Sequence, residues 1–340
     1  MSRETNVAVF QDTCERFKEA ALAEAIRKSL EKQKIYGEDE VLENTEPVYK
    51  KKAVVTVSDK KSFEAALKYR GMKVCVHNFA SFTNPGGGVV NGSSAQEESL
   101  CRVSTLYPLL SDGRMMSGFY RKHKDMLRNG EVTATYNDDA IYTPDVVVFK
   151  DDHRMQMLPE SQRMSLDVIT IAAPNLRPNS NNKWNPEPSK AIAVKPMELL
   201  AIHKKRAKRL FFIAKANGAE VLVLGAFGCG AFQNPPEVVA RAYKEVLAEF
   251  EYDFDTVEFA DVSLKNERGT VLDGISFRIE KGEKIAIVGE TGCGKTTLLK
   301  SINKLLPVQQ GTLKINGTPV SQIKVNQLPN LVGYVVQAGG

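Results

Sequence analysis

The sequence predicts an α/β protein whose mostly parallel sheet is covered by helices on both faces. Two observations predict this class. Short apolar runs rich in Val and Ile alternate with helical patterns, and two of these runs lead directly into glycine-rich loops. Alternating strands and helices are typical of parallel sheets, whose ligands bind beyond the carboxyl ends of the strands. We therefore expect the functional residues at the two glycine-rich loops.

The elements follow from the spacing of apolar residues and from turn residues. An apolar stripe at helical spacing predicts a helix over residues 12–34. Strands rich in β-branched residues are expected at 53–58, 73–80, 140–150, 167–175 and 219–224. The remaining helices are expected at 62–71, 95–110, 196–217 and 235–250.

Charge and cysteine usage limit the function classes. A formal charge of +5 permits an anionic partner without demanding one. The basic run HKKRAKRL from His203 predicts either a solvated helix face or a surface for a phosphate-rich polymer. Scattered cysteines without a CxxC pair, and histidines without ligand spacing, argue against a disulfide framework and predict no metal. No membrane segment is expected, and a cytoplasmic location is predicted, with a nuclear fraction as the alternative.

The stretch NPGGGVVNGSSAQEESL, from Asn84, places three glycines shortly before two adjacent carboxylates. A run of glycines permits positive φ and is expected to present successive N–H groups to an anion. Neighbouring helix residues point about 100° apart, so Glu97 and Glu98 are expected to have different roles. One would perform acid–base chemistry and the other would orient a ligand hydroxyl. A tight turn and a solvated helix face are the alternatives.

A second glycine-rich loop begins at Gly225 and also follows an apolar strand. Two such loops at strand ends suit a diphosphate held from two sides. At this point the motifs resemble those of the bacterial or microbial type of poly(ADP-ribose) glycohydrolase, a macrodomain enzyme. The resemblance rests on Gly-Gly-Gly, a spacer and Gln-Glu-Glu, with HNFAS, DVITIAAPN and LVLGAFGCGAFQNPPEVVA in family order.

The resemblance implies a three-layer α/β/α macrodomain-like fold with an ADP-ribose pocket, and residues 1–254 are assigned to it. It implies hydrolysis of the ribose–ribose O-glycosidic bonds of poly(ADP-ribose), releasing ADP-ribose without a cofactor. The implied partners are poly(ADP-ribose) or ADP-ribosylated proteins, and no DNA is predicted. An ADP-ribose reader without turnover is an alternative, although the presence of both glutamates favours the enzyme.

The resemblance also implies a role for each motif residue. Glu98 matches the catalytic glutamate, which protonates the leaving ribose oxygen and then activates water. Glu97 matches the glutamate that holds ribose hydroxyls. Phe227 matches an aromatic residue beside the ribose, with a core aromatic as the alternative. The implied substrate-binding residues are Asn84, Gly86, Gly87, Gly88, Gln96, Phe227, Gly228, Cys229 and Gly230.

A second phosphate-binding motif, GETGCGKT, lies between an apolar β-run and a helical pattern. Its surroundings resemble the N-terminal part of an ABC-transporter ATPase domain, so residues 255–340 are assigned to a truncated ABC-type ATP-binding domain, a partial P-loop NTPase. The implied residues for ATP and Mg²⁺ are Gly289, Gly292, Gly294, Lys295, Thr296, Thr297 and Gln337.

Several parts of the ABC family pattern are missing from this region. They are the adenine-stacking aromatic, the LSGGQ signature, the Walker B acidic residue and the switch histidine. Weak ATP binding without turnover is therefore expected, and the missing motifs count against an ABC-type transporter subunit as the main function. Deletion of residues 256–340 is expected to abolish ATP binding and to preserve glycohydrolase or reader activity.

Overall fold

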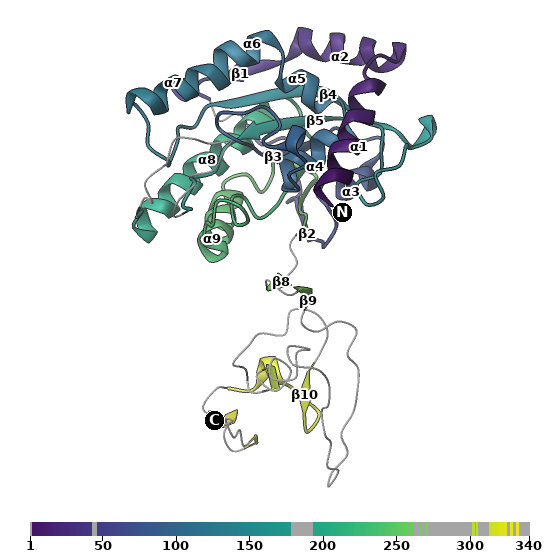
Figure 1. Cartoon of the computed structure of the whole chain (residues 1–340). Coiled ribbons are helices and arrows are strands. Elements are labelled where there is room, and N and C mark those ends of the chain that lie inside the picture. The colour runs from purple at the N-terminus through teal and green to yellow at the C-terminus, as the bar shows by residue number, and fades with distance from the viewer. Residues whose placement is uncertain are drawn as a thin grey trace, which may run out of the picture. The chain divides into compact units, whose positions relative to one another are not determined.

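The structure is a computed structural model, and it describes residues 2–42, 46–177, 193–261, 265–266, 269–270, 301–302, 304, 313–324, 327–328 and 331–332. The chain divides into two units, Met1–Val262 and Ser263–Gly340 (Figure 1). None of the helices in these ranges is long and apolar enough to cross a membrane.

A mixed sheet of seven strands forms the centre of the first unit. Its order is β1-β4-β5-β3-β6-β7-β2. The central strand β3 pairs in parallel with β5 and β6, whereas β4 is antiparallel to both of its neighbours. The predicted mostly parallel sheet is thus confirmed. The strands are β1 (Lys34–Tyr36), β2 (Val54–Val57), β3 (Val74–Phe79), β4 (Ala140–Val148), β5 (Met164–Ile171), β6 (Val221–Leu224) and β7 (Thr256–Phe259).

Helices cover both faces of this sheet (Figure 1). One face carries α8 (Pro196–Ala216) and α9 (Pro236–Leu247). The other face carries α1 (Arg3–Arg16), α2 (Ala20–Lys32), α3 (Ser62–Ala66), η1 (Leu67–Tyr69), η2 (Val89–Asn91), α4 (Gln96–Val103), α5 (Leu106–Leu110), α6 (Gly113–Met115) and η3 (Met116–Arg121). Helix α7 (Lys122–Asn129) continues η3, and η4 (Glu160–Gln162) precedes β5.

Two apolar cores result, one on each face of the sheet. Successive residues of a strand point to opposite faces. Val74 and Val76 of β3 therefore lie in the core with α4, and Cys75 between them lies in the core with α8 and α9. This division gives the three layers expected from the sequence.

Two predicted helices are each divided in the structure. The helix expected over residues 12–34 is wrong, because α1 ends at Arg16 and α2 begins at Ala20. The turn lets Phe17 pack edge-on against Phe149. The helix expected over residues 95–110 breaks at Ser104, which is extended and bridges to Val148 of β4. In both places contacts with distant residues outweigh local helix propensity.

Strand β7 was assigned from sequence to the second domain, and this assignment is wrong. Thr256–Phe259 pairs in parallel with both β6 and β2, so it belongs to the sheet of the first unit. The predicted domain division after residue 254 would remove this strand. Its pairing with β6 and β2, and not the change in composition before it, decides where it belongs.

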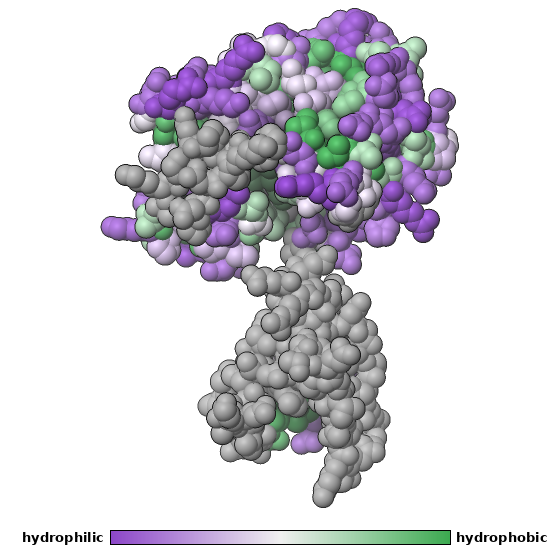
Figure 2. All heavy atoms as spheres, in the orientation of Figure 1, coloured by the Kyte–Doolittle hydropathy of each residue, from purple (hydrophilic) through white to green (hydrophobic). Residues whose placement is uncertain are grey.

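The described parts of the second unit are short. Strand β8 (Lys265–Asn266) pairs with β9 (Gly269–Thr270), and β10 (Lys314–Ile315) pairs with β11 (Thr318–Pro319), which leads into η5 (Val320–Gln322). The residues predicted to bind ATP, from Gly289 to Thr297 and at Gln337, lie outside the described residues. Hydrophilic side chains cover most of the described surface of the first unit on the face shown in Figure 2.

Candidate active site

The two glycine-rich loops meet at one edge of the sheet. Strands β3 and β6 are parallel neighbours, so the segments that follow Phe79 and Leu224 leave the sheet side by side. The rings of Phe79 and Phe227 lie 5.8 Å apart. A Cβ on Gly225 would approach the ring of Phe79 to 2.8 Å, so only glycine permits this close approach of the second loop to β3.

The first loop uses its backbone N–H groups within the protein. The N–H of Gly87 donates to the carbonyl of Asn84 at 3.0 Å, and the N–H of Gly88 donates to Oε1 of Glu98 at 2.9 Å. The expected row of N–H groups free for an anion is therefore wrong for these two residues. The loop instead binds a carboxylate of the chain itself.

The two carboxylates of α4 lie against this loop and are both buried. Oε2 of Glu97 accepts from the N–H of Ser81 at 2.7 Å, and Oε1 accepts from Nδ2 of Asn78 at 3.4 Å. Glu98 is 7% exposed, and its Oε2 has no hydrogen-bond partner among the described residues. Glu97 is thus held through both oxygens, and Glu98 through only one.

Gly87 permits this convergence. Its φ is +58°, and a Cβ there would lie 2.6 Å from Oε1 of Glu98 and 3.2 Å from Oε2 of Glu97. A Cβ would also be strained at this φ. Gly86 has a φ of +66°, and a Cβ there would meet the ring of Tyr107. The glycines therefore make room for the carboxylates and for a neighbouring ring.

Burial raises the pKa of Glu97 well above its ordinary value. The nearby charge of Glu98 acts in the same direction, while the hydrogen bonds from Ser81 and Asn78 oppose it. Glu97 therefore retains its proton to higher pH than an exposed carboxyl would.

Gln96 fixes α4 to β3. Its Oε1 accepts from the N–H of Phe79 at 2.8 Å, and its Nε2 donates to the carbonyl of His77 at 2.8 Å and to Oγ of Ser62 at 3.0 Å. Its amide is fully used in supporting the helix. Asn84 lies at the start of the glycine run, where its Nδ2 donates to Oγ1 of Thr83 at 3.3 Å.

The side chain of Asn234 helps to hold the second loop in place. Nδ2 of Asn234 donates to the carbonyls of Gly228 at 3.1 Å and Pro174 at 2.7 Å. Because this amide nitrogen faces two acceptors, Oδ1 faces His203 and accepts from its Nε2 at 2.9 Å. In the described part of the chain, the N–H groups of Gly228 and Gly230 make no hydrogen bond. These two donors suit a diphosphate.

Phe227 lies in the core, and Cys229 lies beside the loop. Phe227 is 2% exposed and packs against His77, at 4.5 Å between ring centroids. The structure thus agrees with a core aromatic here, and contact of Phe227 with a ribose stays a prediction. Burial raises the pKa of Cys229 to about 11, so its thiol is protonated at neutral pH.

The basic run of α8 is mostly engaged with the protein itself. Arg206 is buried and its Nε donates to Oδ1 of Asp138 at 3.0 Å. Lys204 and Lys208 pair with Glu245 and Glu249. The expectation of a simply solvated face is therefore wrong for Arg206. No group of three or more His, Cys, Asp or Glu within the described ranges is arranged to hold a metal ion.

Sequence reasoning missed three residues that build the site. Asn78 and Ser81 bind Glu97, and Asn234 holds the second loop. All three lie in segments whose motifs pointed to the site. The alternation along β3 predicts that Asn78 faces α4, but the role of the Ser81 backbone depends on how the chain turns after the strand.

Comparisons with known proteins agree with this geometry. Residues 4–151 match the family described as the catalytic domain of microbial-type poly(ADP-ribose) glycohydrolase (PARG). The structure is similar to that of poly(ADP-ribose) glycohydrolase from Thermomonospora curvata, at 26% identity and a TM-score of 0.63, covering 76% of this chain and 93% of that one. It is also similar to the Deinococcus radiodurans enzyme in complex with ADP-ribose, at 28% identity and a TM-score of 0.59, covering 72% and 93%.

The second unit matches a different family. Residues 272–339 match the ABC transporter family. Over 69 residues the chain is 44% identical to the glutamine transport ATP-binding protein of Bacillus subtilis. This alignment covers 20% of this chain and 28% of that protein. Over 102 residues it is 34% identical to the ATP-dependent lipid A-core flippase of Desulfotalea psychrophila, covering 30% and 17%. The chain spans less than a third of the length of these curated relatives.

The match to the PARG family begins in α1 and ends just after β4, so it contains the glycine run and both glutamates of the site. The structural similarity covers 76% of this chain, a larger share than the family match. Residues 4–151 are therefore similar to the microbial-type PARG catalytic domain, and the first unit has the fold of the bacterial poly(ADP-ribose) glycohydrolases.

Proposed function

We propose that the first unit is a glycoside hydrolase that cleaves the ribose–ribose O-glycosidic bond of poly(ADP-ribose) and releases ADP-ribose. One observation carries this proposal. Two buried carboxylates lie on a glycine loop beside a second loop, and neither Oε2 of Glu98 nor the N–H groups of Gly228 and Gly230 have a partner among the described residues. A diphosphate on the second loop would place the attached ribose near these carboxylates.

The two glutamates would have different roles in the reaction. Glu98, in its neutral form, gives its proton to the leaving ribose oxygen while the bond from that oxygen to the anomeric carbon breaks. The resulting carboxylate then takes a proton from the water that attacks the anomeric carbon, which restores Glu98. Glu97, held by Ser81 and Asn78, keeps lone pairs that accept hydrogen bonds from ribose hydroxyls.

The test measures ADP-ribose released from purified poly(ADP-ribose) by the full chain and by Glu98→Gln. We expect wild-type release to fall by about 10²–10⁴-fold in the variant, as for the loss of a general acid. ADP-ribose binding, measured by calorimetry, is expected to survive, because Gln can still accept from the N–H of Gly88. A folded wild-type chain that binds ADP-ribose without releasing it from the polymer would instead be a reader.

A shortened chain must keep β7. Deletion from residue 256 would remove the strand that joins β2 to β6, so that variant is expected to unfold. Deletion of residues 263–340 leaves the whole first unit. This shorter chain is expected to keep its glycohydrolase activity and to show which unit binds ATP.

For the second unit we propose ATP and Mg²⁺ binding through the phosphate-binding motif from Gly289 to Thr297. Its support is the ABC transporter family match over residues 272–339. Binding of a fluorescent ATP analogue is expected in the full chain and is expected to be lost in Lys295→Ala.

The proposed partners of the first unit are poly(ADP-ribose) and ADP-ribosylated proteins, and the proposed location is the cytoplasm.

A further inference from the structure

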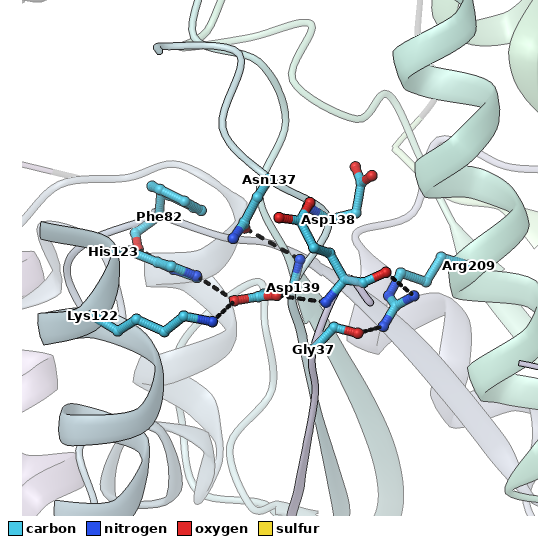
Figure 3. A network of polar contacts seen from close by, with 9 residues as sticks. Gly37, Phe82, Lys122, His123, Asn137, Asp138, Asp139 and Arg209 are labelled. Atoms are coloured by element: carbon cyan, nitrogen blue, oxygen red, sulfur yellow. Dashed lines mark hydrogen bonds and ion pairs between the residues drawn. The ribbon is translucent and has the colours of Figure 1, made fainter. Parts of the chain in front are cut away.

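The segment that supports Glu97 is held by a stack of three rings. Ser81 donates its N–H to Glu97, and the next residue, Phe82, is 2% exposed. Its ring lies between His123 of α7, at 3.8 Å and an interplanar angle of 6°, and Tyr136, at 4.2 Å and 13°. Figure 3 shows the histidine ring beside Phe82. Any movement of this stack therefore moves the backbone that binds Glu97.

His123 is also bonded to this segment through its ring nitrogens. Nδ1 lies 3.2 Å from the carbonyl oxygen of Phe82, and Nε2 lies 2.8 Å from Oδ2 of Asp139. A carbonyl oxygen only accepts hydrogen bonds, and so does an ionised carboxylate. Both bonds can exist together only when both ring nitrogens carry a hydrogen, so this geometry requires the imidazolium form.

Asp139 supplies the charge that this form needs. Its Oδ2 also accepts from Nζ of Lys122 at 2.8 Å, and its Oδ1 accepts from the N–H of Glu38 at 2.7 Å (Figure 3). Burial alone would raise the pKa of Asp139, but the hydrogen bonds from His123, Lys122 and Glu38 outweigh it and hold that pKa well below its usual range. Asp139 is therefore a carboxylate at neutral pH.

We infer that His123, as an imidazolium bonded to Asp139, is a positioning residue that holds the Phe82 backbone and through it the carboxylate of Glu97. This inference rests on the proposed function, because it assigns a role in the same reaction. A ring with only one N–H could make only one of its two bonds. The segment from Ser81 to Asn84 then loosens without any change in the glutamates themselves.

Among the described residues, two charged groups lie at this ring. They are Asp139, from the segment before β4, and Lys122, its neighbour on α7. The other described contacts of the ring are the aromatic rings of Phe82 and Phe119. Asp139 stabilises the proton on His123, and Lys122 competes for the same carboxylate oxygen. The two residues are therefore expected to affect the proton in opposite directions.

The first experiment observes the proton directly. Two-bond ¹H–¹⁵N correlation spectra of the full chain report whether each ring nitrogen of a histidine carries a hydrogen. The chain has four histidines, and the signal that disappears in His123→Gln belongs to His123. We expect both nitrogens to be protonated at pH 7. A neutral ring at that pH overturns the inference, whatever the activity of the chain.

The second experiment follows ADP-ribose release against pH. The alkaline limb of the profile is expected at lower pH in Asp139→Asn and at higher pH in Lys122→Met. His123→Gln is expected to lower kcat by about 10–100-fold, as for a displaced catalytic group, and to leave the limb insensitive to these two substitutions. The exposed His153 provides the matched control, because His153→Gln should change neither quantity.

The outcomes separate the inference from the proposed function. A limb that stays at the same pH in Asp139→Asn and Lys122→Met shows that His123 only fills space, and overturns the inference. If wild type releases no ADP-ribose, the glycohydrolase proposal fails. The same variants are then compared by the pH dependence of ADP-ribose affinity, in which the opposite shifts are still expected.

Discussion

The two glycine-rich loops of the first unit look alike in sequence and differ in the use of their backbone. In the first loop the N–H of Gly88 donates to Glu98, and the N–H of Gly87 donates to the carbonyl of Asn84. The second loop has its carbonyl at Gly228 bound by Asn234 and leaves the N–H groups of Gly228 and Gly230 without partners in the described chain. The first loop therefore orients Glu98, the proposed catalytic group, and the second has two N–H groups available for the proposed diphosphate.

This difference separates two reasons for the presence of glycine. In the first loop the space beside Gly87 is occupied by the carboxylates of α4. In the second loop the space beside Gly228 is occupied by Ala173 and Asn234, which hold the loop from behind. Substitutions in the two loops should therefore affect different kinetic constants.

The largest effect is expected for Gly87→Ala. The new Cβ would lie 2.6 Å from Oε1 of Glu98, so the carboxylate must shift, and a shift of about 1 Å costs about 10²-fold in kcat. Gly71→Ala is the matched control, because Gly71 also has a positive φ but has nothing within 4 Å of the new Cβ. Steady-state kinetics with poly(ADP-ribose) measure both variants. Equal losses in the two would show that backbone strain, and not the carboxylate contact, is responsible.

A smaller effect on a different constant is expected for Gly228→Ala. The new Cβ would lie 2.6 Å from Nδ2 of Asn234 and would displace the loop, so that a hydrogen bond to a charged ligand is lost. The expected cost is about 10-fold in ADP-ribose affinity with kcat nearly unchanged. Gly230→Ala has open space and should bind almost normally. Calorimetric titration with ADP-ribose gives the comparison, and a fall in kcat alone would contradict it.

The smallest effect concerns pH and the support of the second loop. Burial lowers the pKa of His203 to about 4, from about 6.5 when unfolded, so the unfolded chain binds more protons between these values. The stability that neutral His203 contributes is present above pH 6.5 and is lost as the pH falls toward 4.

Calorimetric melting at pH 7.5 and pH 5.0 measures this dependence. His203→Gln should make the drop in Tm between the two pH values smaller. The reduction should be about 2–4 °C for each kcal/mol that His203 contributes to the pH dependence of the free energy of unfolding. Burial also lowers the pKa of His77, to about 3, so part of the drop should remain. An unchanged drop would mean that His203 is not buried as described.

The sequence was sufficient for the layers of the fold and for the location of the site. Strand alternation along β3 predicts which side chains reach each core, and the glycines with Gln96, Glu97 and Glu98 predict where the site lies. The bonding of the Gly88 N–H to Glu98 could not be read from the pattern, because it depends on the approach of α4 to the loop. The stack around Phe82 brings together residues from three separate segments, so no short sequence pattern predicts it.

The position of β7 also affects how the chain folds while it is being made. Among the described strands β2 pairs with β7 alone, and Ser58, which follows β2, is bonded to Glu258 across 200 residues of sequence. At translation rates of about 5–20 residues per second, β2 waits on the order of 10–40 s for its partner. During that interval the backbone of β2 lacks the strand with which it pairs, and Val54, Val55 and Val57 are exposed even in the folded unit, so this edge is open to pairing with another chain.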